Sequence, residues 1–119
     1  MVNRERIDIY KRIFGLVVNV IKVLNRIPKT PTNLIIINQL TRSVTSMGAN
    51  GEEADGSSTK KDFVHCFTIV RKEGKETLFW LKLISSTNTG FEDDINPLIQ
   101  EGNEIIAIVS TIIKKILDK

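Results

Sequence analysis

Apolar side chains recur at alternating spacings of three and four residues in four separate segments of the chain. Such spacing returns to one side of an α-helix at every turn, so each segment predicts an amphipathic helix. The helices are expected over about residues 4–27, 33–54, 60–85 and 97–118. The isoleucine and valine in the outer two segments favour strands weakly, but sustained helical spacing outweighs that preference.

The first of these helices carries two apolar stripes. One stripe is Ile7, Tyr10, Phe14, Val17, Ile21 and Leu24, and the other is Ile13, Leu16, Val20, Val23 and Ile27. One stripe is enough to pack a helix against its partners in a bundle. The second implies more apolar surface than the other helices of one chain can cover, so we expect copies of the chain to assemble.

Turn residues and helix caps mark the first two breaks in the pattern. Pro28 and Pro31 cannot easily continue the first helix, and Thr32 is the expected N-cap of the second. Thr59 followed three residues later by Asp62 resembles a capping box, which predicts the start of the third helix.

The last helix is expected to begin at the pair Asn96-Pro97, as an N-cap followed by proline at the first helical position. Four helices with short connections pack most simply as an antiparallel up-and-down bundle. We therefore expect an all-α fold, with residues 1–119 forming one four-helix-bundle domain.

Composition agrees with a small soluble domain. The chain has 119 residues, of which 41% are hydrophobic and 26% are charged. No apolar stretch is long enough to cross a bilayer, and the charged N-terminal segment lacks the apolar core of a signal peptide. We expect a cytoplasmic protein with no membrane contact. The single cysteine excludes an internal disulfide framework and a cysteine-based zinc site.

The residues of common catalytic centres are missing from the pattern. A di-iron bundle needs two Glu-x-x-His motifs, and this chain has one histidine, His65. Its neighbour Cys66 points in another direction on a helix, so the two cannot form a nucleophile–base pair. We expect a protein without enzymatic activity, metal or cofactor.

A polar stripe interrupts the apolar pattern on the second and third helices. Its members are Gln39, Arg42, Ser46, Asn50 and Glu53 on the second helix, and Glu73 and Glu76 on the third. Carboxylates in an apolar stripe need partners, because an unpaired buried charge is costly. Arg42 is the natural partner, shared between Glu53 and Glu76. Two interpretations stay open: a cluster that fixes the register of two helices, or a site for a ligand or partner.

The formal net charge is +3, and basic residues gather on the first and third helices. The candidates for nucleic-acid contact are Arg4, Arg12, Lys60, Lys61, Arg71, Lys72 and Lys75, with Lys82 on the same helix. Such residues usually form a solvated face. An oligomer would repeat the patch and strengthen its field, which favours contact with the phosphates of RNA or DNA.

Several motifs resemble a known family. They are QLTRSVTSMGAN at residues 39–50, Glu53-Ala54, Lys61-Asp62-Phe63, KEGKET at residues 72–77, and Trp80-Leu81. The sequence resembles the bacterial four-helix-bundle proteins found in intervening sequences of large-subunit ribosomal RNA genes. The resemblance covers the whole chain in helix order and is most specific between Gln39 and Leu83. Within it, Arg42, Asn50, Glu53 and Glu76 occupy the family's motif positions.

The resemblance implies an up-and-down four-helix bundle that assembles into a homo-oligomeric ring, typically a pentamer, with no established enzymatic activity. Relatives include accessory proteins of diversity-generating retroelements, which bind reverse transcriptase and nucleic acid through a basic surface. Our leading hypothesis is a non-enzymatic oligomeric bundle that binds RNA or DNA as an accessory to a reverse transcriptase. The alternatives are a protein-interaction scaffold, whose surface docks a protein and no nucleic acid, and a small-molecule or metal-binding bundle using Arg42, Glu53 and Glu76.

Overall fold

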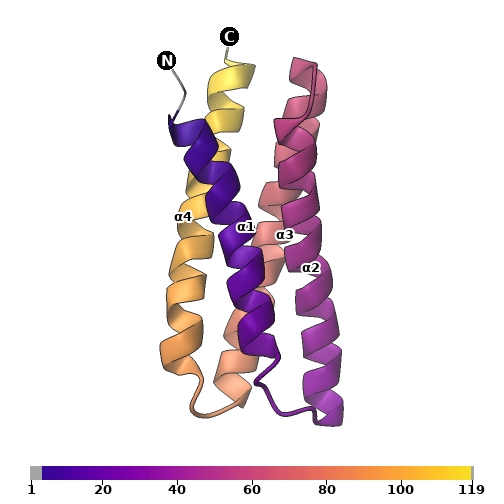
Figure 1. Cartoon of the computed structure of the whole chain (residues 1–119), viewed down its shortest axis with the longest axis vertical. Helices are drawn as coiled ribbons and strands as arrows, with labels where there is room; N and C mark the ends of the chain where they lie inside the picture. The colour runs from indigo at the N-terminus through magenta and orange to yellow at the C-terminus, as the bar shows by residue number, and fades with distance from the viewer. Residues whose placement is uncertain (1–3, 119) are drawn as a thin grey trace.

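The computed structural model describes the backbone of residues 4–118 and the side chains of residues 9–118. It contains four helices, α1 (Arg4–Leu24), α2 (Pro31–Asp55), α3 (Lys60–Thr87) and α4 (Glu92–Leu117). Successive helices run in opposite directions, so the start of α1 and the end of α4 lie at the same end of the bundle as the α2–α3 turn (Figure 1). The expected all-α antiparallel bundle is confirmed, and no strand occurs within residues 4–118.

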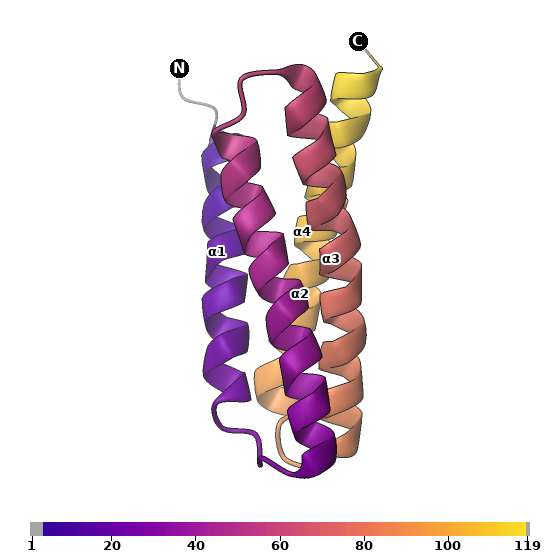
Figure 2. The same cartoon turned by 90° about the vertical axis from the view of Figure 1, so that its right-hand side faces the viewer.

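The helices form a closed square in which each one packs against two others. Within the described backbone, α1 contacts α2 and α4, and α3 contacts the same two helices. The α2–α3 pair has the most extensive contact, and Figure 2 shows these two helices side by side along their length. None of the four described helices has both the length and the apolar character that a membrane span requires.

The two apolar stripes of α1 differ in how deeply they are buried. The core-facing stripe is Ile13, Leu16, Val20, Val23 and Ile27, all buried, with Ile9 and Leu24 beside it. On the other stripe, Tyr10, Val17 and Ile21 are half-buried and Phe14 is 60% exposed. The side chain of Ile7 lies outside the described residues. Helix α1 therefore does present apolar surface that its own chain leaves uncovered.

The stripes expected on α2 and α3 form the centre of the core. Buried members are Leu40, Val44, Met47 and Ala54 on α2, and Phe67, Val70, Leu81 and Ile84 on α3. Phe67 is fully buried, and its ring lies 4.5 Å from that of Phe63 and 6.0 Å from that of Tyr10 on α1. Phe67 thus links helices that lie diagonally across the bundle.

Two of the expected helix starts lie elsewhere. Helix α2 begins at Pro31, and its N-cap is Thr30, whose hydroxyl accepts a hydrogen bond from the Asn33 amide at 3.1 Å. Thr32 is therefore not the cap. Proline suits the first position of a helix, where its missing N–H would have no intrahelical partner. The cap at Thr59 is confirmed, with its hydroxyl accepting from the Asp62 amide at 3.1 Å.

The expected start of α4 at Asn96-Pro97 is also wrong. The helix begins at Glu92 and includes Pro97 in its second turn. Three acidic residues in the first turn complement the positive end of the helix dipole. Ile95, fully buried in the core, supplies apolar contact that outweighs the one backbone hydrogen bond that Pro97 cannot donate.

Candidate nucleic-acid interface

The polar stripe becomes an ion-pair cluster between α2 and α3. Arg42 donates one guanidinium N–H to Glu73, at 3.1 Å from Nη1 to Oε2, and another to Glu76. The indole N–H of Trp80 donates to the same Glu76 carboxylate at 3.1 Å. The Trp80 bond, followed by that of Arg42, holds the pKa of Glu76 below its ordinary value. Glu76 is thus fixed from two sides.

The pairing of Arg42 with Glu53 that we expected is absent. The two residues belong to the same helix, and eleven intervening rises of about 1.5 Å each separate them by three turns. Glu73, from the facing helix, takes the place of Glu53. Because Glu73 is largely buried and Arg42 covers it, the cluster satisfies a charge that would otherwise be costly.

Further polar contacts on this interface support the register interpretation. The Ser43 and Thr77 hydroxyl oxygens, both buried, lie 2.9 Å apart, and Thr77 donates to the Glu73 carbonyl at 2.8 Å. Sequence reasoning missed this link, although a small hydroxyl residue on each helix, Ser43 beside the polar stripe and Thr77 among apolar residues, was a usable signal. Asn50 donates to the Ser46 carbonyl at 2.9 Å within α2, and Gln39 is exposed.

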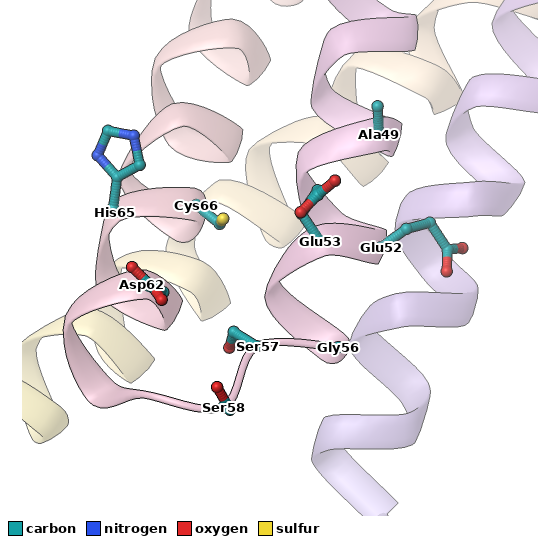
Figure 3. A pocket seen from close by; sticks show the side chains of 9 residues that line it. All are labelled: Ala49, Glu52, Glu53, Gly56, Ser57, Ser58, Asp62, His65 and Cys66. Carbon is teal, nitrogen blue, oxygen red and sulfur yellow. The ribbon is translucent and has the colours of Figure 1, made fainter.

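A hollow opens where α2 turns into α3. Its lining is Ala49, Glu52, Glu53, Gly56, Ser57, Ser58, Asp62, His65 and Cys66 (Figure 3). The lining holds three carboxylates and no Lys or Arg, so it repels a polyanion. No group of residues within the described part of the chain is arranged to hold a metal ion.

The thiol in this hollow is poorly suited to nucleophilic chemistry. Burial, followed by the carboxylates of Glu53 and Asp62, raises the pKa of Cys66 and keeps the thiol protonated. His65 points away from Cys66 (Figure 3). The two side chains therefore do not form a nucleophile–base pair in this arrangement.

Arg12, a candidate for phosphate contact, is occupied within the bundle. Its guanidinium donates to both carboxylate oxygens of Glu101, at 2.9 and 2.6 Å, and to Glu104 at 2.9 Å. These bonds raise the pKa of Arg12 above its ordinary value and lower the pKa of Glu101 below its ordinary value. Arg12 joins α1 to α4, and its charge is compensated there. The side chain of Arg4 lies outside the described residues.

The outer side of α3 carries lysines that form no ion pair with the described carboxylates. We call Lys61, Lys72, Lys75 and Lys82 the lysine face, because their spacing places them on one side of the helix. All four side chains are exposed, and none forms an ion pair with a carboxylate of the described residues. Lys60 is exposed at the start of α3, whereas Arg71 is half-buried. The lysine face brings together three of the seven expected contacts, Lys61, Lys72 and Lys75, and adds Lys82 from the same helix.

Comparisons with known proteins agree with this architecture. One similar solved structure is the crystal structure of a protein with unknown function from the S23 ribosomal protein family of Bacteroides thetaiotaomicron VPI-5482. It is 24% identical, the match covers 92% of this chain and 98% of that one, and the TM-score is 0.82, which shows a shared fold. No curated protein matches the sequence. The family of 23S rRNA-intervening sequence proteins matches over residues 5–111, and the chain therefore belongs to that family.

Proposed function

We propose that the protein is a non-enzymatic, oligomeric bundle that binds RNA or DNA through the lysine face of α3. The proposal rests on one observation. Among the described residues, no carboxylate forms an ion pair with Lys61, Lys72, Lys75 or Lys82. Lysines without an ion pair can neutralise phosphates, and the cations that are then released from the nucleic acid drive binding. Phosphate contacts of this kind position a nucleic acid without reading its sequence.

The distribution of the acidic groups supports the same surface. Arg12 and Arg42 are compensated by glutamates, and the hollow at the α2–α3 turn is acidic. The lysine face is therefore a basic surface over several turns of a helix whose lysines form no ion pair with the described carboxylates. A polyanion approaching the protomer is drawn to the lysine face and away from the acidic hollow.

Assembly into a ring, with a pentamer as our proposed form, would strengthen this field. The support is the less buried stripe of α1, where Phe14 is exposed and Val17 and Ile21 are half-buried, with the half-buried Val18 beside it. Burying such a stripe against a second copy removes apolar surface from water. Each added copy repeats the lysine face, so several weak contacts act on one nucleic acid.

The cellular setting that we propose follows the family resemblance. Accessory proteins of diversity-generating retroelements pair nucleic-acid binding with a reverse transcriptase. We propose a cytoplasmic protein whose lysine face holds nucleic acid for such an enzyme. Co-purification of a reverse transcriptase encoded beside the gene would support this role, and a neighbourhood without one would contradict it.

Salt-dependent binding tests the proposal. Fluorescence anisotropy with a labelled RNA should show affinity that falls steeply as salt is added. Changing Lys72, Lys75 and Lys82 to alanine should reduce the slope of log affinity against log salt by about two for a single strand. A matched control changes the exposed Lys22, Lys114 and Lys115 to alanine and removes equal charge elsewhere. Equal losses in the two variants, or a flat salt response, would contradict the proposal.

A protein-interaction scaffold without a nucleic-acid role is the second candidate. Exposed Leu34 and Ile35 near the start of α2 favour it, because adjacent exposed apolar side chains are typical of protein contacts. Under this alternative, Ile35→Asp abolishes capture of a protein partner, and alanine at the three lysines leaves all measured binding unchanged.

A further inference from the structure

Phe79 occupies an unusual place on the lysine face. Its side chain is 55% exposed, with Lys75 one turn before it and Lys82 one turn after it on the same side of α3. A large aromatic ring exposed among lysines does not serve the core, and a polar residue would suit a simple solvated face better. The position therefore calls for a ligand with both an apolar flat surface and negative charge.

Neighbouring groups hold the Phe79 ring in place. Its centroid lies 4.9 Å from that of Trp80, with an interplanar angle of 72°. Trp80 is fixed in turn by its hydrogen bond to Glu76, and Glu76 by Arg42. An edge-on arrangement of two rings covers at most one face of Phe79. A ring fixed in this way loses little conformational freedom when a ligand stacks on its open face.

We propose that Phe79 stacks on an unpaired nucleobase, so that the lysine face prefers single-stranded nucleic acid to duplex. This inference rests on the nucleic-acid binding proposed above and adds the class of ligand. In a duplex both faces of each base are already stacked, whereas a single strand presents them to an aromatic side chain. Lys75 and Lys82, separated by about 10 Å of helix axis, can then contact phosphates on either side of the stacked nucleotide.

The polar cluster acquires a second role under this proposal. Arg42 and Glu76 fix the register of α2 and α3, and through Trp80 they also position the Phe79 ring. Arg42 and Glu76 are positioning residues that do not touch the nucleic acid. The stacking contact itself depends on Phe79.

The test compares the full-length wild type with Phe79→Leu, which keeps an apolar side chain of similar volume and removes the aromatic face. Affinities for a labelled single strand and for a duplex of the same sequence are measured by anisotropy. Phe79→Leu should weaken single-strand binding about tenfold and leave duplex affinity unchanged. Its salt slope should match the wild type, because no phosphate contact is removed. Phe79→Trp, which keeps an aromatic face at this position, should bind the single strand as tightly as the wild type does.

Two further measurements make the outcome specific. Trp80 is the single tryptophan and lies against Phe79, so a single strand should change its emission more than a duplex does. Ile35→Ala, which trims an exposed apolar side chain on α2, is the matched control and should leave the single-strand preference intact.

The possible failures are distinguishable. If the wild type binds neither nucleic acid, the proposed function itself is wrong. If it binds both and Phe79→Leu has no effect or weakens both equally, only the stacking inference is overturned. A change in the oligomer mass of Phe79→Leu would assign the ring to a contact between copies and would also overturn it.

Discussion

The α2–α3 pair and helix α1 are attached to the bundle in different ways. Between α2 and α3, polar groups meet across the interface, with Arg42 on Glu73 and Ser43 on Thr77. Helix α1 contributes an apolar stripe to the core and, at the rim, the ion pairs of Arg12 with Glu101 and Glu104. Hydrogen bonds require their partners in fixed positions, whereas apolar burial is non-directional. The comparison teaches that α2 and α3 set the register of the bundle.

The outward surfaces of these helices differ as well. The outer side of α3 is basic and includes one exposed ring, that of Phe79, whereas the outer side of α1 is apolar around Phe14. Exposed positive charge favours a polyanion, and exposed apolar surface favours another protein surface. In our account α1 serves assembly and α3 serves binding.

The largest effect on stability is expected at Phe67, the residue that joins the two regions. Phe67→Ala should lower the free energy of unfolding by about 3–5 kcal/mol, because it leaves a cavity between Phe63 and Tyr10. Urea unfolding followed by circular dichroism measures the loss. The control Phe79→Ala, at an exposed position, should change the same free energy by no more than about 0.5 kcal/mol. Similar losses in both variants would show that Phe67 does not link the helices as described.

A smaller effect is expected at the ion pair between α1 and α4. Arg12→Ala should lower the free energy of unfolding by about 1–2 kcal/mol near neutral pH, because Glu101 is left half-buried without its partner. The exposed neighbour Lys11, changed to alanine, is the control. Urea midpoints of both variants and the wild type give the comparison.

The pH dependence of that effect has a defined sign. Because Arg12 lowers the pKa of folded Glu101, the stabilisation is present above the unfolded glutamate value of about 4.3. It is lost as the pH falls through the lower pKa of the folded state. The difference between wild type and Arg12→Ala should therefore shrink in acid, and a difference that grows there would contradict the assigned pair.

The fold could be predicted where the signal is local. The apolar stripes of α2 and α3 and the cap at Thr59 depend on residues within a few turns of each other, and they are confirmed. The start of α4 was missed because Asn96-Pro97 is a strong local signal that the burial of Ile95 overrides. Pro31 was likewise expected to lie outside a helix, but it is the first residue of α2.

The candidate site could be predicted only in part. Helical spacing identified Arg42 and Glu76 as partners, but the choice of Glu73 over Glu53 depends on how two helices are aligned, which no local pattern records. The pairing of Arg12 with Glu101 spans 89 residues and has no sequence signature. Phe79 was not predicted as a site residue, because the apolar spacing of α3 identifies core positions and Phe79 lies outside it.

Light scattering at low protein concentration tests most directly whether α1, and not α3, forms the contact between copies of the chain. The wild type should have a mass several times the 13.4 kDa of one chain, fivefold for the ring that we propose. Phe14→Glu should reduce the mass to that of a folded protomer, whereas Phe79→Glu should leave it unchanged. A wild type that remains a well-folded monomer, or an assembly that Phe79→Glu dissociates and Phe14→Glu does not, would contradict the account.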